Sequence, residues 1–542
     1  MSGSENIGGS GPRVSSEQKG GAGQTSISGH ISRSGYVRTI SVSPPTLGNN
    51  TADAQRLEQA LKKELGTGFV HIPWHLVRNL SARLRRWDWQ VRVVLFRDRR
   101  SFLVVDLLDP ADAAPVLGAA LDIGTTRMVI ALIDLDTGKT LAETGFDNPQ
   151  ADIGPDVLTR IHHARTRAGR ADLQGLAVAA VNQHLAQLCK ESMAAPDRVF
   201  LLAGAGNTAM THLFAGLPAF GIIQEPYIPC TNIPDTLAAQ RIGLEMHPEG
   251  QVFLFPNIGS YFGGDLLAGI LAADLDKKET PCIMVDVGTN AEIVLGGRDW
   301  LIACAGAAGP ALESGVSQMG MTAKPGVIDR VGVDPSNREL VIHTIDDQPP
   351  VGICGSGMID LAAALFLTGR IDIRGKLMPD ACEGRLRDQD GIQAFVLVDA
   401  ADSGTKDPIC LSQVDLNSLT SAKAAMYTIL EVIVAQTAGL SFEDLDKFYV
   451  AGTFGSFINP KSAISIGMLP DIPVDRFQVL GNTSLKGAQL LLTDPDAFDR
   501  VTAVRDTITY IELNVNQSFM TLFSGAKFFP HTDRSRFPSV QI

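Results

Sequence analysis

GAALDIGTTRMVIALIDLDTGKTLAETG, from Gly118 to Gly145, and PCIMVDVGTNAEIVLGGRDWLIACAG, from Pro281 to Gly306, share one pattern. Each contains an apolar strand, a loop of the form D-x-G-T-T or D-x-G-T-N, a second apolar strand, a tight turn and a third strand. The chain thus encodes the same antiparallel meander twice. An internal repeat says more about architecture than any single motif. We therefore predict two related lobes, each built on one meander.

The loops of both meanders are suited to phosphate. Gly124 and Gly288 let the backbone turn sharply and bring its N–H groups close to an anion. Asp122 and Asp286 end the preceding strands, where a carboxylate can hold a hydrated Mg²⁺ or orient an attacking water. One such turn is a weak signal, but two in matched meanders predict a phosphate site. The side chains that add short donors in these loops are Thr125, Thr126, Thr289 and Asn290.

Three further glycine turns are candidates for the same site. KFYVAGTFGSFINP, from Lys447, is a buried strand followed by a glycine loop that can approach a base or ribose. FLLAGAGNTAMTHLFAG, from Phe200, places Asn207 and Thr208 in a turn that either lines the site or only packs. GICGSGMIDLAAALFLTG has a helix whose N-terminus can meet phosphate. Its turn consists of Gly355, Ser356 and Gly357.

Glu313 follows the second meander, in AAGPALESG from Ala307 to Gly315. It is either a site residue or part of a helix cap, and the sequence leaves both readings open.

Composition limits the class of protein. The chain has 542 residues, enough for about three or four domain-sized units. Its hydrophobic content of 45% and charged content of 19% are typical of globular proteins. A net charge of −13 argues against nucleic acid as the main partner. With no signal-peptide segment and no apolar run of membrane-spanning length, we predict a soluble cytoplasmic protein without a membrane partner.

The seven cysteines lie far apart and include no C-x-x-C pair. This spacing is typical neither of a disulfide framework nor of a zinc or iron–sulfur site. We expect isolated buried thiols. The cysteines are Cys189, Cys230, Cys282, Cys304, Cys354, Cys382 and Cys410.

Three segments are predicted along the chain. Residues 1–50 form a disordered Gly/Ser-rich tail and an extended linker, because they have little to bury. Residues 51–115 form a small α+β domain with a helix ending at Gly66, a second helix from Pro73 to about Trp87, and a hairpin. Residues 116–542 carry the two lobes.

The small domain is rich in arginine within an acidic chain. This cluster is either a docking face for an acidic partner or an ordinary solvated helix face and turn. It consists of Arg78, Arg83, Arg85, Arg86, Arg92, Arg97, Arg99 and Arg100.

Two meander lobes with paired acidic phosphate loops and a late glycine loop resemble the actin-like ATPase (ASKHA) superfamily. Within it, the chain resembles the reductive activators of corrinoid-dependent methyltransferases. The motifs that carry this likeness, in order, are DIGTT, DNPQADIGPDVLTRI, GNTAMTHLFAG, EPYIP, VDVGTNAEI, AAGPALESG, GICGSGMIDL, VAGTFGSFINP, IGMLPDIP and LGNTSLKGA. They span most of the chain from Leu117 to Lys527.

The resemblance implies an α/β fold with two RNase H-like lobes, preceded by a small α+β middle domain and a disordered tail. It implies that ATP drives reduction of a corrinoid protein from Co(II) to Co(I), and that a homodimer is one candidate assembly. It places ATP phosphates and Mg²⁺ at Asp122, Gly124, Thr125, Thr126, Asp286, Gly288, Thr289 and Asn290. It places the adenosine near Gly452, Thr453 and Gly455.

One feature departs from the family pattern. Typical members begin with a ferredoxin domain whose cysteines hold a 2Fe–2S cluster, but no cysteine here precedes Cys189. We therefore expect no iron–sulfur cluster in this chain. Either a separate ferredoxin supplies the electron to the corrinoid protein or methyltransferase, or the activity differs.

Two other functions stay open from sequence. A small-molecule kinase of the same superfamily would need a general base near the γ-phosphate, and only Asp122, Asp286 and Glu313 are candidates. A non-enzymatic nucleotide-dependent switch would need only slow hydrolysis.

Overall fold

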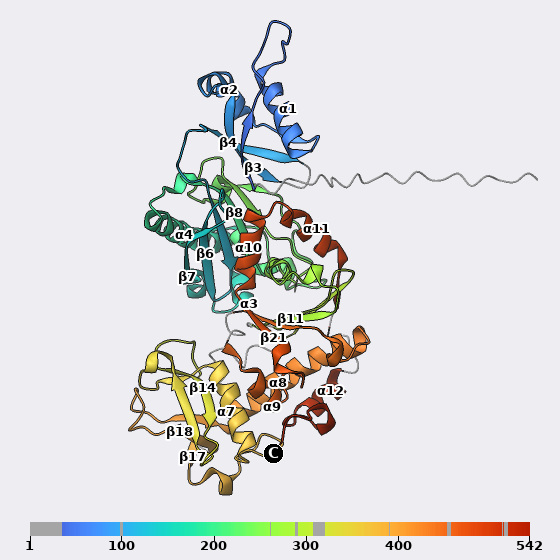
Figure 1. Cartoon of the computed structure of the whole chain (residues 1–542). Coiled ribbons are helices and arrows are strands. Elements are labelled where there is room, and N and C mark those ends of the chain that lie inside the picture. The colour runs from blue at the N-terminus through green and yellow to red at the C-terminus, as the bar shows by residue number, and fades with distance from the viewer. Residues whose placement is uncertain are drawn as a thin grey trace, which may run out of the picture.

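In the computed structural model, the chain forms a small N-terminal unit and two larger lobes that follow one another along one line (Figure 1). The structure describes residues 35–97, 101–260, 262–287, 291–306, 320–389, 391–452, 457–511, 513 and 519–541.

The first lobe is built on a six-stranded sheet, and the first repeated meander forms one half of it. The meander strands pair antiparallel, the next two strands on the other side of β5 run parallel to it, and the edge strand β9 is antiparallel. The central strands β5 and β8 are almost wholly buried because both faces of the sheet are covered. In spatial order the strands are β7 (Thr140–Asp147), β6 (Arg127–Asp134), β5 (Leu117–Ile123), β8 (Val199–Gly206), β10 (Gln251–Leu254) and β9 (Leu237–Ala238).

The second lobe repeats five of these strands in the same order, and its sixth strand, β22, lies beside the meander at the other edge. Its strands are β21 (Phe477–Gly481), β20 (Phe448–Ala451), β11 (Cys282–Val287), β12 (Ala291–Gly296), β13 (Leu301–Gly306) and β22 (Ile508–Ile511). In both sheets the three meander strands are followed by two parallel strands beside the first of them, which is the RNase H-like order. The predicted two-lobed α/β fold is therefore confirmed.

Two helices, α6 (Gly264–Ala272) and α10 (Thr483–Thr493), lie between the sheets and join the lobes. One apolar core contains residues of both sheets and both helices, among them Ala120, Met284 and Leu491. Opening the lobes would therefore disturb a shared core.

The outer face of the first sheet packs against α4 (Arg167–Glu191) and α5 (Thr208–Phe214). This second core closes the lobe on the side away from α6 and α10.

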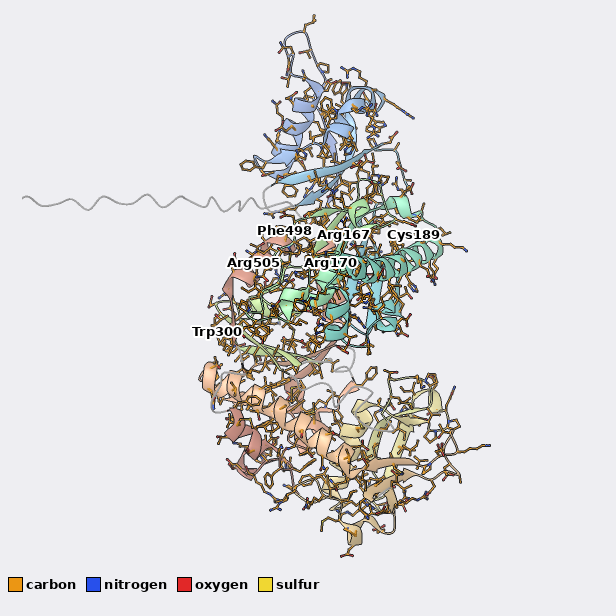
Figure 2. All side chains as sticks on the ribbon, turned by 180° about the vertical axis from the view of Figure 1, so that it is seen from behind. Arg167, Arg170, Cys189, Trp300, Phe498 and Arg505 are labelled. Atoms are coloured by element: carbon orange, nitrogen blue, oxygen red, sulfur yellow. The ribbon has the colours of Figure 1, made fainter. Side chains whose placement is uncertain are left out.

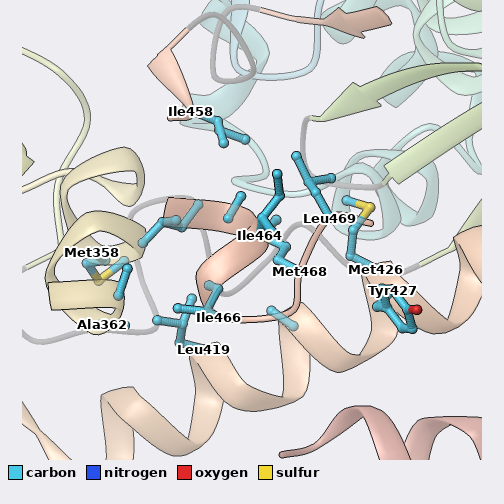
Figure 3. Packing of buried hydrophobic residues seen from close by; sticks show 14 of the residues in the cluster. Met358, Ala362, Leu419, Met426, Tyr427, Ile458, Ile464, Ile466, Met468 and Leu469 are labelled. Carbon is cyan, nitrogen blue, oxygen red and sulfur yellow. The ribbon is translucent and has the colours of Figure 1, made fainter. Parts of the chain in front are cut away.

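A third core lies beneath the second sheet, where residues that follow α9 (Pro460–Ser465) pack between α7 (Gly355–Leu367) and α8 (Gln413–Glu431) (Figure 3). α12 (Phe519–Ala526) packs against α8. Two small sheets extend this end of the lobe: β15 (Leu340–Thr344), β14 (Val327–Val333) and β16 (Gly352–Ile353), and β17 (Leu386–Gln389), β18 (Ile392–Val398) and β19 (Ile409–Ser412).

The helical stretch Gln413–Thr437 is long and apolar enough to cross a membrane, and no other helix in the described ranges has both properties. However, 72% of its most apolar window is buried inside the protein. Lys423, fully buried in the middle of this stretch, donates from Nζ to the carbonyls of Phe528 and Pro530. These contacts assign the stretch to the core of the second lobe.

The small N-terminal unit packs two helices on a four-stranded sheet. α1 (Asp53–Leu65) ends at Gly66, which has φ 61°, and α2 (Trp74–Arg86) begins directly after Pro73, so both predicted helices are confirmed. The sheet order is β1 (Val37–Ser41), β3 (Gln90–Arg97), β4 (Phe102–Leu108) and β2 (Val70–His71). β1 lies within the segment assigned to tail and linker, so the sheet begins before residue 51.

Many arginines of the small unit form ion pairs within the chain. Arg83 pairs with Asp106 at 3.4 Å, and Arg85 pairs with Asp53 at 2.7 Å. Two others attach the unit to the first lobe, through the pairs Arg92–Asp136 and Arg97–Asp499. Arg97 also lies over the ring of Phe498 at this junction. Figure 2 labels Phe498. These four arginines therefore act within the chain, which for them favours the structural interpretation over a docking face.

Candidate functional site

Three carboxylates from three different elements converge between the lobes. Asp122 lies near the end of β5, Asp286 near the end of β11, and Asp265 in the first turn of α6. Burial raises the pKa of Asp122 to about 6, and donors from Asn482 and Ser484 oppose the rise. Burial and the charge of Asp122 raise the pKa of Asp286 to about 7. Burial, with the charges of Asp286 and Asp122, raises the pKa of Asp265 to about 7.

These carboxylates repel one another, so a cation bound between them would be favoured. Within the described part of the chain, no Lys or Arg forms an ion pair with any of them. In the same residues, no group of three His, Cys, Asp or Glu side chains is close enough to hold a metal ion directly. Acids within electrostatic reach of one another, but too far apart to coordinate one ion directly, suit a hydrated Mg²⁺ held through its waters.

The first phosphate loop is held from behind by its carbonyl groups. The side-chain amide of Asn148 donates to the carbonyl of Gly124 at 2.8 Å, and the guanidinium of Arg160 donates to that of Thr125 at 2.7 Å. In a trans peptide the N–H points opposite to the C=O. The N–H groups of Thr125 and Thr126 therefore face away from these donors, and they have no acceptor among the described residues. Two adjacent free N–H groups suit a phosphate oxygen.

Gly124 makes this loop conformation possible. A Cβ at this position would lie 2.1 Å from the carbonyl oxygen of Arg127. Any side chain would therefore force the loop open, which is the physical basis for the glycine in the repeated motif.

Two asparagines tie the loop and its aspartate to helix starts. Asn207 donates to the Thr125 hydroxyl at 3.0 Å and caps α5. Asn482 donates from its side chain to Asp122 at 2.8 Å and caps α10. Because Asn482 follows β21 of the second lobe and Asp122 belongs to the first, this hydrogen bond connects the lobes at the site.

The late glycine loop begins directly beside Asp286. Gly452 has φ 83°, and a Cβ there would lie 2.6 Å from Asp286 Oδ1 and 2.9 Å from the carbonyl oxygen of Val287. The structure thus places the start of the candidate adenosine loop beside β11, the strand that carries Asp286.

Gly452→Ala is expected to weaken Mg·ATP binding and lower stability, because the new methyl group must displace Asp286. Gly439→Ala is the matched control, since Gly439 has φ 68° but open space around its Cβ position. Both variants carry the cost of a left-handed alanine, about 1 kcal/mol. Gly452→Ala should cost about 1–3 kcal/mol more. Urea unfolding and calorimetry with Mg·ATP measure the two effects, and equal behaviour of the variants would contradict this placement of Gly452.

The candidate turn Gly355–Gly357 forms the start of α7 and contacts a neighbouring strand. Ser356 is buried and donates to the carbonyl of Asp329 at 3.0 Å, and Gly357 packs so closely that a Cβ would lie 2.5 Å from the carbonyl of Ile328. The turn Gly355–Gly357 therefore packs on β14. The candidates that lie outside the described residues are Gly288, Thr289, Asn290, Thr453, Gly455 and Glu313.

Comparisons with known proteins identify the family. Three family models match in sequence order: the RACo linker region over residues 31–112, the RACo middle region over 117–278, and the C-terminal domain of RACo, the ASKHA domain, over 280–541. The chain is 31% identical over 419 residues to the corrinoid activation enzyme RamQ of Eubacterium limosum, covering 76% of this chain and 70% of that protein. This chain belongs to the RACo family.

Two further RACo-like proteins extend the match. A Co(II) methylated amine-specific corrinoid protein reductase of Methanosarcina barkeri is 25% identical over 423 residues, covering 72% of this chain and 73% of that protein. The solved structure of a reductive activator for a corrinoid, iron–sulfur protein superimposes with a TM-score of 0.82 at 35% identity. The superposition covers 94% of this chain and 82% of that structure. The small unit, expected as a middle domain, corresponds to the RACo linker model, and the RACo middle model covers the first lobe.

Sequence reasoning missed four residues of this candidate site. Asn148, Arg160 and Asn482 stand inside stretches that the family resemblance had already singled out, so their motifs were visible but their roles were not. Asp265 had only the Gly263–Gly264–Asp265 run before a helix as a signal. A Cβ on Gly263 would lie 2.6 Å from Asp265 Oδ1, so this glycine makes room for the carboxylate.

Asp265→Asn is expected to remove part of the pH dependence of stability. A carboxyl whose pKa is raised to about 7 in the folded state stabilises the fold below its unfolded pKa near 4, and this contribution is lost as pH rises through about 7. In magnesium-free buffer the variant should gain on the order of 1–2 kcal/mol over wild type between pH 5 and pH 8. Thermal unfolding at both pH values measures the gain. Asp299→Asn, at a side chain 86% exposed, is the control without such a gain.

Proposed function

We propose that this chain binds Mg·ATP between its two lobes and uses ATP hydrolysis to drive reduction of a corrinoid protein from Co(II) to Co(I). The observation that carries the nucleotide part is the convergence of Asp122, Asp265 and Asp286 beside two free N–H groups of the first loop. The corrinoid part is supported by membership of the RACo family and by the activities named for its relatives.

In this proposal the residues have distinct roles. Asp122 and Asp286 would hold the waters of Mg²⁺, and Asp265, within electrostatic reach of both, would position the water that attacks the γ-phosphate or accept its proton. Bound Mg²⁺ neutralises phosphate charge in the transition state. Thr125 and Thr126 orient the phosphates, and Gly452 with Thr453 and Gly455 lies near the adenosine. Gly288, Thr289 and Asn290 serve the second phosphate loop.

The reaction balances as two coupled steps. Water attacks the γ-phosphate to give ADP and inorganic phosphate, and one electron from a donor protein converts Co(II) to Co(I). All seven cysteines are free thiols, and six of them are buried. We therefore assign the electron to a separate ferredoxin-like protein. Asn482 and the shared core around α6 and α10 link the site to the relative position of the lobes, which supplies the coupling.

We further infer that residues 116–542 act as one nucleotide-binding unit, that the small N-terminal unit, which includes β1, forms a separate domain, and that the protein works in the cytoplasm. Neither a membrane nor nucleic acid has a part in this proposal.

The test combines the purified chain, a Co(II) corrinoid protein, a low-potential one-electron reductant and Mg·ATP. We expect Co(I), followed by visible absorption, to accumulate only when all components are present, and phosphate release to increase with the corrinoid protein. Equal Co(I) formation without ATP contradicts the proposal. Phosphate transfer to a metabolite would indicate a kinase, and hydrolysis indifferent to the corrinoid protein would indicate a switch.

A further inference from the structure

Arg160 is a fully buried arginine directly behind the first phosphate loop. It belongs to α3 (Val157–His163) and has an exposed fraction of 0%. Its Nη1 donates to the carbonyl of Thr125 at 2.7 Å, and its Nε donates to that of Gly154 at 2.7 Å. Nη2 has no hydrogen-bond partner, and no carboxylate in the described ranges forms an ion pair with this guanidinium.

A buried charge without an ion-pair contact is costly, so its retention needs a reason; the negative charge that acts on Arg160 is that of Asp156. Arg56 of the small unit shows the ordinary structural case. It is 3% exposed, and its Nε and Nη2 donate to the carbonyls of Thr51 at 2.8 Å and Asn49 at 2.6 Å. Both of its Nη atoms have acceptors, whereas Nη2 of Arg160 has none. Arg160 differs because one of its Nη groups, and the positive charge it carries, has no acceptor beside the proposed phosphate loop.

The hydrogen bonds of Arg160 also fix a direction. The peptide between Thr125 and Thr126 has its C=O turned toward Arg160, so the N–H of Thr126 points the opposite way. Asn148, 1% exposed, donates to the carbonyl of Gly124 and so turns the N–H of Thr125 away from itself. A planar guanidinium suits this role, because its donors have fixed directions and it remains protonated.

We propose that Arg160, together with Asn148, is a positioning residue that turns the N–H groups of Thr125 and Thr126 toward the nucleotide phosphates. The buried positive charge of Arg160 also attracts these phosphates. The inference rests on the proposed binding of Mg·ATP by this loop. Arg160 acts through the backbone and does not touch the nucleotide.

The test compares full-length Arg160→Lys and Arg160→Met with Arg56→Met. Lysine keeps the charge but lacks the planar fork. We expect the Kd for Mg·ATP to rise about tenfold in Arg160→Lys and further in Arg160→Met, because charge-assisted hydrogen bonds are among the stronger ones. In ATPase assays KM should rise with kcat changed much less. Arg56→Met should lower the unfolding temperature of the free protein and leave Kd within about twofold.

The outcomes separate the two proposals. Wild type that binds no Mg·ATP overturns the proposed function. Wild type that binds, with a folded Arg160→Lys that binds equally well, overturns only the role of Arg160. An equal loss of affinity in Arg56→Met also overturns it, because the effect would then follow general destabilisation. If Arg160→Met does not fold, Asn148→Ser tests the same arrangement, and unchanged affinity there counts against it.

Discussion

Asp286→Ala is expected to reduce Mg·ATP turnover about 100-fold or more while leaving the fold intact. The side chain ends a central strand, next to Gly452 and within the electrostatic reach of Asp122 and Asp265. Removing it takes away one of the two carboxylates proposed to hold hydrated Mg²⁺. The variant should also be at least as stable as wild type above pH 7, because burial and the charge of Asp122 raise the pKa of this carboxyl to about 7 and its ionised form is disfavoured.

Phosphate release, calorimetry with Mg·ATP and thermal unfolding at pH 8 measure these effects. Asp299→Ala is the control, because that carboxylate lies in the turn after β12 and its side chain is 86% exposed. The control should match wild type in all three measurements. Normal affinity and hydrolysis in Asp286→Ala would remove this residue from the site, and a collapse of the fold would show that the carboxylate has a structural role.

Gly487→Ala is expected to destabilise the protein by about 2–3 kcal/mol, an unusual result for a glycine inside a helix. A Cβ on Gly487 of α10 would lie 2.2 Å from the carbonyl oxygen and 2.5 Å from the Cα of Ala268 in α6. Both neighbours are backbone atoms, so the two helices must move apart. They occupy the space between the sheets, and the shared core must open with them.

Gly175→Ala is the matched comparison. Gly175 also lies inside a helix, α4, but a Cβ there meets no atom within 4 Å. Alanine at this position should stabilise the protein by about 0.5–1 kcal/mol, because it lowers the entropy of the unfolded chain and favours helix. Urea unfolding of both variants measures the opposite signs. Two changes of the same sign would contradict the close crossing of α6 and α10.

Gly487→Ala should also weaken nucleotide binding, because α10 begins at Asn482, the residue that bonds Asp122 across the lobes. A shift of α10 moves this amide. Calorimetry with Mg·ATP on the folded variant measures the loss of affinity, and Gly175→Ala again serves as the control. Unchanged affinity would show that the inter-lobe hydrogen bond is not needed for binding.

The fold was largely predictable because its signal is local. Alternating and continuous apolar runs, with Gly and Asp at fixed places, determine strands and turns over a few residues, and the repeat of Asp122–Gly124 at Asp286–Gly288 marked the two lobes. The helix stop at Gly66 was readable for the same reason. The strand β1 was missed because it has only five residues of alternating burial and follows a Gly/Ser-rich tail. Its pairing with β3 identifies it as a strand.

The site was predictable only in part. Asn207 donates to the Thr125 hydroxyl, so two of the predicted turns do lie side by side, and their part in phosphate binding stays a prediction. The turn Gly355–Gly357 begins α7 and packs on β14, and its part in phosphate binding stays a prediction.

By itself, the sequence determined two meander lobes with an acidic, glycine-containing loop in each, because strand alternation and turn chemistry act between near neighbours. Only the tertiary structure decided that Asp265 joins Asp122 and Asp286, that Asn482 reaches across the lobes, and that Arg160 stands behind the loop. These contacts join residues up to 360 positions apart. Their partners are set by how α6, α10 and the two sheets pack, and no local pattern in the chain encodes that packing.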